Sequence, residues 1–321
     1  MIKFDRKNVL ITGGSGFLGR HLAMALAPKC NVIIGGRNHT LIQYASNVTS
    51  CISIPLDVRS KDSISNALRI YQPEIIIHAA ATKFVQQSEA SPDECIETNI
   101  IGSQNLAHLA SEHNVQVVIG ISTDKAAAPV GSIYGHTKSI MERYFISLDA
   151  VFETNLLCVR FGNIAWSSGS VLPVWKLMTE SDGIVRTSGL GMYRYMFGVD
   201  DAVQLVLDAI DIAADMHGTV ISSPMEVVPI SDLLDAWCEI YRTNYIQCER
   251  RLGDKVHEVL IAESELVYSR TFNHNGRLLY AIDYSQLSTK PISKQICTAT
   301  SPVMSTSCIH KLINNTPAKI F

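Results

Sequence analysis

Short apolar segments alternate with longer amphipathic ones through the first half of the chain. The short segments are rich in β-branched residues and bounded by glycine, proline or polar residues, which is typical of strands. We predict strands at 8–12, 31–35, 51–55, 74–78, 115–122 and 155–161, and helices at 16–27, 60–71, 92–113 and 131–148. Nearly continuous apolar strands that alternate with helices predict an α/β fold with a doubly wound parallel sheet, covered on both faces.

The regular alternation ends near residue 163. Turns rich in serine and glycine at 167–170 and 188–191 precede predicted helices at 200–214 and 231–242 and a predicted strand at 219–222. Residues 285–321 are polar with little periodicity, which leaves open whether they form peripheral elements or a loosely ordered tail. We predict one domain at 1–165 and a smaller region at 166–321, some of whose elements return to the first sheet.

Composition and charge argue against several classes of protein. The 321 residues carry a net charge of −3, which provides no electrostatic basis for binding nucleic acid or an anionic membrane. The eight cysteines include no C-x-x-C pair, which argues against a zinc site or disulfide scaffold and favours a reducing compartment. There is no apolar segment typical of a signal peptide and no apolar run long enough to span a membrane. We expect a cytoplasmic protein without a metal site.

A glycine-rich turn follows the first predicted strand and opens the first predicted helix. It contains Gly13, Ser15, Gly16, Phe17, Leu18 and Gly19. Glycines at this position let backbone N–H groups approach a pyrophosphate, which the positive end of the helix also attracts. The G-x-x-G-x-x-G spacing is that of short-chain dehydrogenases, so the turn predicts a Rossmann-type dinucleotide site.

The end of the second predicted strand bears on the choice of cofactor. NAD enzymes place a carboxylate there for the ribose 2′-hydroxyl, whereas an arginine accommodates the 2′-phosphate of NADP. This chain has Arg37 and no acid, so NADP is favoured over NAD, with a solvated surface arginine as the alternative. Asp57 is a candidate for adenine contact, and Ala79, Ala80 and Ala81 provide small side chains where the cofactor would cross the fourth strand.

A tyrosine and a lysine lie on one face of the helix predicted at 131–148. Tyr134 and Lys138 are four residues apart, and Thr123 lies just upstream at the end of the fifth strand. The ammonium is expected to lower the pKa of the phenol, so that Tyr134 acts as acid and base beside a nicotinamide ring. This position after the fifth strand predicts hydride chemistry on an alcohol or ketone.

Asp124 and Lys125 follow at the carboxyl edge of the fifth strand, where ligands bind in such folds. A salt bridge or a helix cap is the plain structural interpretation. The functional interpretation is a second proton-transfer pair, for elimination beside a transient ketone. Neighbouring strand residues point to opposite faces, so both can reach a pocket only if the chain turns there, which residues 126–129 permit.

The chain resembles the inverting UDP-N-acetylglucosamine 4,6-dehydratases of the extended short-chain dehydrogenase superfamily, within the polysaccharide biosynthesis protein family. The matching stretches occur in the family's order from residue 8 to about 265. They are Ser122-Thr123-Asp124-Lys125-Ala126, Tyr134-Gly135-x-Thr137-Lys138, His78-Ala79-Ala80-Ala81-x-Lys83, Thr98-Asn99-Ile100-x-Gly102, Arg160-x-Gly162-Asn163 and Gly253-Asp254-Lys255-x-His257-Glu258.

The resemblance implies a catalytic cycle in which the cofactor is recycled. Tyr134 with Lys138 takes the C4 hydroxyl proton during oxidation, Lys125 removes the C5 proton, and Asp124 protonates the departing C6 hydroxyl. Hydride return to C6 and reprotonation of C5 from the opposite face complete the cycle. Lys125 must be partly neutral to act as a base, and we expect burial near other cations to lower its pKa.

The resemblance also implies contacts with ligands. Asn99 is a cofactor contact, Asn163 and Arg194 are diphosphate contacts, Lys83 lies in a substrate-loop motif, and Glu258 is a nucleoside contact. The alternative for Asn163 is that it only terminates a strand. The alternative for Arg194 and Glu258 is that they are surface charges. The region 166–321 is then mainly substrate-binding, the substrate is a UDP-sugar, and a homo-oligomer is expected.

Three departures from the family pattern lie around the expected sugar-nucleotide site. Ser168 replaces an arginine, residues 189–195 lack an acid and an arginine, and Ser132 replaces an asparagine. Two other functions also stay open. One is a sugar-nucleotide 4-epimerase or simple NADP oxidoreductase, and the other is a nucleotide-binding regulator without catalysis.

Overall fold

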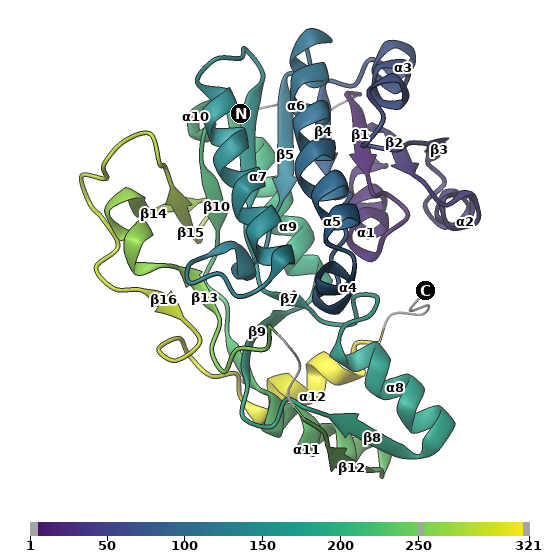
Figure 1. Cartoon of the computed structure of the whole chain (residues 1–321), viewed down its shortest axis with the longest axis vertical. Coiled ribbons are helices and arrows are strands. Elements are labelled where there is room, and N and C mark those ends of the chain that lie inside the picture. The colour runs from purple at the N-terminus through teal and green to yellow at the C-terminus, as the bar shows by residue number, and fades with distance from the viewer. Residues whose placement is uncertain (1–5, 250–252, 317–321) are drawn as a thin grey trace.

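A nine-stranded sheet forms the centre of the structure, a computed structural model that describes residues 6–249 and 253–316 (Figure 1). Parallel strands run in the order β3–β2–β1–β4–β5–β6–β10, and the hairpin β15–β14 continues the sheet antiparallel beside β10. The predicted doubly wound α/β fold is confirmed. The strands are β1 (Asn8–Thr12), β2 (Asn31–Gly36), β3 (Ile52–Pro55), β4 (Ile75–His78), β5 (Val117–Ile121), β6 (Asn155–Val159), β10 (Val220–Ser222), β14 (Ser269–His274) and β15 (Arg277–Ile282).

Helices cover both faces of this sheet. In Figure 1, α6 and α7 lie in front of the strands and α9 lies behind them, where it packs against α1. The central strands are buried because both faces are covered, which explains their uninterrupted apolar sequences. The helices of this layer are α1 (Phe17–Leu26), α2 (His39–Thr49), α3 (Lys61–Tyr71), α6 (Gly102–Glu112), α7 (Ile133–Asp149), α9 (Val199–Asp211) and α10 (Ala213–Met216).

The helix predicted at 92–113 is not regular throughout. It consists of α5 (Pro92–Ile96), a π-helical turn at Glu97–Ile101 and α6. A π-helical turn widens the helix locally and often marks a functional position. Here it carries Thr98 and Asn99, which face different surroundings in the site described below.

Three helices are not predicted by the sequence pattern, namely α2, α4 (Val85–Ala90) and α8 (Val171–Asp182). α2 buries only three side chains, so its apolar periodicity is weak. Its N-cap is nevertheless well formed, because the Asn38 side chain accepts a hydrogen bond from the backbone N–H of Leu41 at 3.0 Å.

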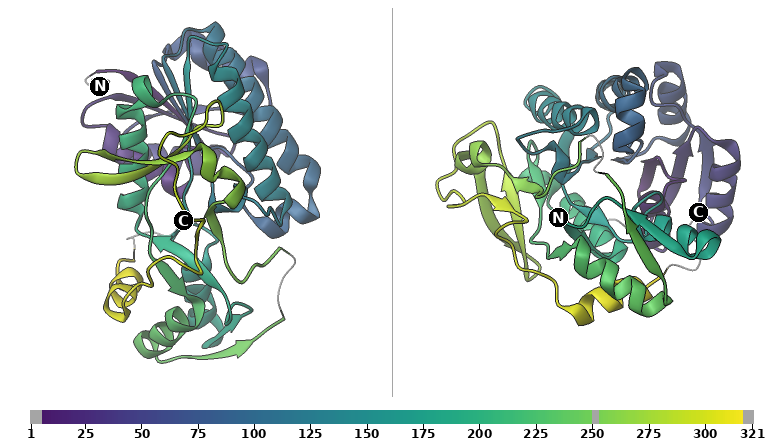
Figure 2. Two further views of the ribbon diagram at one scale, coloured as in Figure 1. Left: turned by 90° about the vertical axis from the view of Figure 1, so that its left-hand side faces the viewer. Right: turned by 60° about the horizontal axis from the view of Figure 1, so that its bottom comes forward.

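The second region lies below the carboxyl edge of the large sheet and is visible from two further sides in Figure 2. A cluster of aromatic side chains, with Trp166 and Trp175 both packed against Trp237, forms its core. Its elements are β7 (Asn163–Ile164), β8 (Ile184–Thr187), β9 (Tyr193–Phe197), β11 (Val227–Pro229), α11 (Ile230–Tyr241), β12 (Asn244–Gln247), β13 (Val259–Ile261), β16 (Ile296–Cys297) and α12 (Thr306–Asn314), together with α8.

The C-terminal segment contains ordered elements in the part that the structure describes. β16 pairs with β13, and α12 packs against α11. Of residues 285–321, whose order the sequence did not decide, 317–321 lie outside the described residues. Across 6–249 and 253–316, no helix combines the length and apolar character needed to cross a membrane.

Candidate active site

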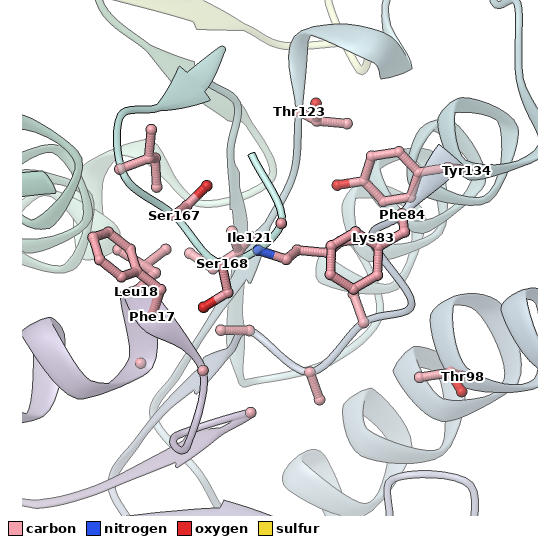
Figure 3. A pocket seen from close by; sticks show the side chains of 18 of the residues that line it. Phe17, Leu18, Lys83, Phe84, Thr98, Ile121, Thr123, Tyr134, Ser167 and Ser168 are labelled. Carbon is pink, nitrogen blue, oxygen red and sulfur yellow. The ribbon is translucent and has the colours of Figure 1, made fainter. Parts of the chain in front are cut away.

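A cavity of about 660 Å³ opens at the carboxyl ends of the parallel strands (Figure 3). The glycine-rich turn and α1 form one wall, the ends of β4 and β5 form the floor, and residues 161–170 of the second region form the opposite wall. The predicted site residues that line it are Gly13, Ser15, Gly16, Phe17, Leu18, Gly19, Arg37, Ala79, Ala80, Ala81, Lys83, Thr123, Lys125, Tyr134, Lys138 and Asn163. Residues far apart in the sequence thus share one cavity.

The turn before α1 has the geometry of a phosphate site. Gly13 adopts φ +67°, and a Cβ there would lie 2.7 Å from the backbone of Ala79 and Ala80. A Cβ on Gly19 would lie 2.5 Å from the Gly13 carbonyl oxygen, so the turn can pack onto the helix only with glycine here. The N-cap Gly16 has no side chain, and the first turn of α1 carries no acid. The helix N-terminus is therefore open to an anion.

The edge of the cavity beside β2 carries the residues expected to select the cofactor. Arg37 lines the cavity, and its guanidinium lies 3.5 Å from the Glu94 carboxylate. Asp57 does not line it. The Asp57 carboxylate accepts hydrogen bonds from Arg59 at 2.6–3.1 Å, and this contact lowers its pKa despite partial burial. The flanking Leu56 contributes the cavity wall at this point instead.

Asn99 is fully buried and holds the segment that follows β4 rather than lining the cavity. Its Oδ1 accepts a hydrogen bond from Thr82 N at 2.8 Å, and its Nδ2 donates to Thr82 O at 3.0 Å and Thr137 Oγ1 at 3.0 Å. These bonds use both N–H donors of the amide and one acceptor position of its oxygen. The expected cofactor contact of Asn99 is therefore replaced by a positioning role, because its polar atoms already have protein partners.

Two hydroxyl groups at the cavity were missed in the sequence analysis. Thr98 and Ser122 are buried and line the cavity, and neither hydroxyl has a hydrogen-bond partner among the described residues. A buried hydroxyl without a partner is costly, so each is available to a polar ligand. Both lie within matching stretches of the sequence, but the spacing alone does not show which members of a stretch face inward.

Tyr134 and Lys138 project from the first turns of α7, which begins after the N-cap Ser132. The Ser132 hydroxyl accepts a hydrogen bond from Gly135 N at 3.1 Å, so serine performs the capping function at this position. Lys138 Nζ donates to the Ile121 carbonyl oxygen at 2.7 Å, and burial lowers the pKa of Lys138 to about 8.

The expected effect of Lys138 on the phenol is not what the structure shows. Burial raises the pKa of Tyr134 to about 12, partly opposed by the charge of Lys125 and by a hydrogen bond with Thr123. Lys138 directs its ammonium to the Ile121 carbonyl and does not lower the phenol's pKa here. The three side chains of Thr123, Tyr134 and Lys138 nevertheless line the same cavity.

The chain turns immediately after β5, as the sequence analysis required for Asp124 and Lys125. Residues Asp124–Ala126 form a 3₁₀ turn in which Thr123 Oγ1 accepts a hydrogen bond from Lys125 N. Lys125 lines the cavity, and its Nζ donates to Asp124 Oδ1 at 3.0 Å. Asp124 is 1% exposed, and burial raises its pKa. An acid and an amine are therefore in direct contact, but only Lys125 lines the cavity, because the Asp124 side chain is buried beside it.

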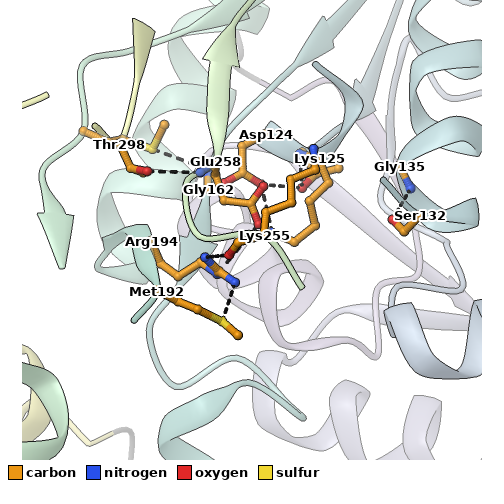
Figure 4. Close-up of polar contacts among 12 residues, drawn as sticks. Asp124, Lys125, Ser132, Gly135, Gly162, Met192, Arg194, Lys255, Glu258 and Thr298 are labelled. Carbon is orange, nitrogen blue, oxygen red and sulfur yellow. Dashed lines mark hydrogen bonds and ion pairs between the residues drawn. The ribbon is translucent and has the colours of Figure 1, made fainter. Parts of the chain in front are cut away.

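Glu258 and Arg194 lie beside Lys125 (Figure 4) and do not line the cavity. Glu258 Oε1 lies 3.4 Å from Lys125 Nζ and 3.7 Å from Arg194 Nε. Arg194 Nη1 donates to the carbonyl oxygens of Tyr193 and Lys255, both at 2.9 Å. This geometry does not support direct contacts of Glu258 with a nucleoside or of Arg194 with a diphosphate, because both are buried and already paired with protein groups.

The surroundings of Lys125 also correct the expectation for its pKa. Burial and the charge of Arg194 lower the pKa of Lys125, but the carboxylates of Asp124 and Glu258 raise it more. The net pKa lies above the ordinary lysine value. Its close neighbours are therefore mainly anions, and the resting group is an ammonium.

Lys83 and Asn163 approach the cavity from opposite walls. Lys83 extends into it in Figure 3, and Asn163 lies at the start of β7. The neighbouring Phe84 packs against Gly169, so that the segment after β4 meets the serine-rich segment 167–170 across the cavity. These are the positions at which a sugar nucleotide could contact both parts of the protein.

Comparisons with known proteins agree with this geometry. The chain matches the polysaccharide biosynthesis protein family over residues 9–278. A UDP-N-acetylglucosamine 4,6-dehydratase (inverting) from Campylobacter jejuni is 34% identical over 280 residues, which are 83% of this chain and 81% of that protein.

Solved structures share the fold. The X-ray structure of Pen from Bacillus thuringiensis has a TM-score of 0.89 at 25% identity and covers 98% of both chains. The dTDP-glucose 4,6-dehydratase DesIV from Streptomyces venezuelae has a TM-score of 0.69 at 18% identity, over 78% of this chain and 86% of that chain. Both share the overall fold with this chain over the residues covered. With the match over residues 9–278, the family suggested by the sequence is confirmed, and the chain belongs to the polysaccharide biosynthesis protein family.

Proposed function

We propose that this chain is a sugar-nucleotide 4,6-dehydratase that acts on UDP-N-acetylglucosamine and inverts C5. One observation carries the proposal: Lys125 lines the same cavity as Tyr134, and its Nζ lies 3.0 Å from the buried carboxylate of Asp124. Oxidation of an alcohol requires only the tyrosine and its lysine. A second proton-transfer pair is needed when a proton and a hydroxyl are removed from neighbouring carbons. The related C. jejuni dehydratase supports the same assignment.

The cavity fits a nicotinamide dinucleotide, and we propose NADP. The open N-terminus of α1 would hold the pyrophosphate, and Arg37 on the cavity wall would pair with a 2′-phosphate. Thr98 and Ser122 would provide hydroxyls for polar groups of the cofactor or substrate. When bound, the cofactor supplies hydride acceptance at C4 and hydride return at C6.

The remaining steps belong to the side chains of this protein. Tyr134 exchanges a proton with the C4 hydroxyl, beside Thr123 at the same cavity. Lys125 takes the proton from C5 through its neutral amine, and Asp124 donates a proton to the C6 hydroxyl, which leaves as water. The C5–C6 double bond forms as the C5–H and C6–O bonds break. A solvent-derived proton then reaches C5 from the opposite face and inverts that centre.

Lys83 and Asn163 are the proposed substrate contacts. Lys83 provides a cation for the diphosphate, and Asn163 provides an amide from the opposite wall. The replacement of a family arginine by Ser168 at this wall removes one charge near the same group. We therefore expect weaker binding of the diphosphate than an arginine at position 168 would provide.

The test is incubation of the purified protein with UDP-N-acetylglucosamine and NADP⁺ in D₂O. The expected product is a 4-keto-6-deoxy sugar nucleotide that has lost one water and carries deuterium at C5. Lys125→Ala is expected to retain C4 oxidation and to slow elimination by about 10²–10⁴-fold. Lys61→Ala, at an exposed position in α3, is the control. A C4 epimer formed without loss of water would support the epimerase alternative instead.

A further inference from the structure

Lys125 is held between two carboxylates that approach from separate parts of the fold. Asp124 Oδ1, in the same turn, lies 3.0 Å from Lys125 Nζ. Glu258, the residue before β13 in the sequence, places its Oε1 3.4 Å from the same nitrogen atom (Figure 4). Lys125 reaches the cavity, whereas Glu258 is 2% exposed and Asp124 is 1% exposed. Glu258 therefore acts on Lys125 from the protein side, and Asp124 contacts Lys125 within the same turn.

The position of Glu258 is constrained by its backbone and by its neighbours. Its N–H donates to Thr298 Oγ1 at 3.0 Å, and its carbonyl oxygen accepts from Thr298 N at 2.9 Å. Arg194 from β9 lies 3.7 Å from the carboxylate and is itself anchored to two backbone carbonyl groups. Lys125, Arg194 and Lys255 keep the pKa of Glu258 low despite its burial, so the carboxylate is ionised.

The proposed chemistry requires a neutral amine and a carboxylic acid at the same time. Transfer of one proton from Lys125 Nζ to Asp124 Oδ1 along their 3.0 Å hydrogen bond produces both groups, with no change in total charge. The active form of the pair thus holds one shared proton. A second proton disables the amine, and loss of the shared proton disables the acid.

We propose that Glu258 is a positioning residue whose ionised carboxylate holds the shared proton on the Asp124–Lys125 pair. This inference rests on the proposed function. It assigns Glu258 a role through Lys125 in place of the nucleoside contact expected from the sequence. A nearby negative charge favours protonation of both members of the pair. The other groups that face the pair are Arg194 and Tyr195 from β9 and Tyr134 from α7. Arg194 disfavours protonation of Lys125, and Lys255 acts on Glu258.

The test is the pH dependence of Glu258→Gln compared with the wild-type protein. Removal of the charge is expected to move both limbs of the pH profile for C5 deuterium incorporation to lower pH, by about one to three pH units. Structural damage alone would reduce the rate without moving both limbs together. Glu258→Asp, which keeps the charge, is expected to restore most of the profile. Glu263→Gln, exposed in the segment after β13, is the control for net charge.

A second measurement does not depend on turnover. NMR of the free protein with isotope-labelled lysine follows the titration of Lys125 directly, with its signal assigned by loss in Lys125→Met. Glu258→Gln is expected to lower the titration midpoint, whereas Arg194→Gln is expected to raise it because it removes a cation. Shifts of the Lys125 midpoint in opposite directions in the two variants support the inference, because structural damage would not give shifts of opposite sign. Unchanged midpoints in both variants overturn it. Absence of dehydration by the wild-type protein, with the shifts intact, would overturn the proposed function alone.

Discussion

The side chain of Asn99 pairs with the backbone of Thr82 as a second strand would. Thr82 N donates to Asn99 Oδ1 at 2.8 Å, and Asn99 Nδ2 donates to Thr82 O at 3.0 Å. The same amide group reaches Thr137 on α7 at 3.0 Å. One buried side chain therefore fixes the segment after β4 relative to the helix that carries Tyr134, and both form walls of the cavity.

Substitution of Asn99 by alanine is expected to destabilise the protein. It leaves the N–H of buried Thr82 without a partner and its carbonyl oxygen with only the Cys95 thiol at 4.0 Å, and an unpaired buried group costs about 1–3 kcal/mol. We expect the free energy of unfolding in urea to fall by about 2–4 kcal/mol. Asn66→Ala, at an exposed position in α3, is the control. Equal stability of the two variants would contradict the positioning role.

Substitution of Arg37 by alanine is expected to weaken NADP binding more than NAD binding. A charge-assisted contact with the 2′-phosphate is worth about 1.5–3 kcal/mol, which corresponds to about a 10- to 150-fold change in Kd. NAD has no phosphate at this position and is expected to bind with nearly unchanged affinity. Calorimetric titration of both cofactors measures the difference, with Arg69→Ala at an exposed position of α3 as the control. A parallel loss for both cofactors would argue against a 2′-phosphate site.

Gly169→Ala is expected to disturb the cavity where its two walls meet. Gly169 adopts φ +73°, and an added methyl group would overlap the ring of Phe84. Gly183 has nearly the same backbone conformation, at φ +67°, but nothing lies near the position of its Cβ. Gly183→Ala therefore carries only the backbone cost of about 1–2 kcal/mol and is the matched control.

The measurement is kcat/KM for the sugar nucleotide. We expect Gly169→Ala to lower it by about 10- to 100-fold through displacement of the cavity wall, and Gly183→Ala to leave it near the wild-type value. Phe84→Ala in the Gly169→Ala background removes the overlap and is expected to recover part of the loss. No recovery in the double variant would show that backbone strain, rather than the ring contact, is responsible.

Buried His78 is expected to make stability depend on pH. Its ring bonds Thr12 Oγ1 at 2.8 Å and Ser103 Oγ at 2.9 Å, and burial together with the charge of Lys138 lowers its pKa from 6.5 to about 3. Between these values the unfolded chain binds the extra proton and the folded protein does not. The free energy of unfolding therefore decreases as the pH falls, by about 1.4 kcal/mol per pH unit from this group.

His78→Gln is expected to remove this component of the pH dependence, although it also lowers stability overall. Urea unfolding between about pH 4 and pH 6 measures the slope for each protein. His136→Gln, at an exposed position of α7, is expected to retain the wild-type slope. A slope for His78→Gln equal to that of the wild-type protein would mean that His78 is protonated in the folded state.

Local sequence patterns predicted the features that depend on neighbouring residues. The turn from Gly13 to Gly19 could be identified because a strand, a glycine-rich turn and a helix follow one another along the chain. Tyr134 and Lys138 could be paired because their spacing places them on one helix face. The helices α4 and α8 were missed, since α4 has only six residues and α8 buries only three side chains.

The contacts between distant segments were decided by tertiary structure. Glu258 lies beside Lys125 because β13 packs against the turn after β5. Sequence periodicity cannot predict this contact between distant segments. The sign of the pKa shift at Lys125 follows from this contact, since two carboxylates outweigh burial and Arg194. The sequence thus identified which residue types are present for the chemistry. Only the folded chain determined which of them meet a ligand and which act through their neighbours, because interactions between charges depend on distance and burial.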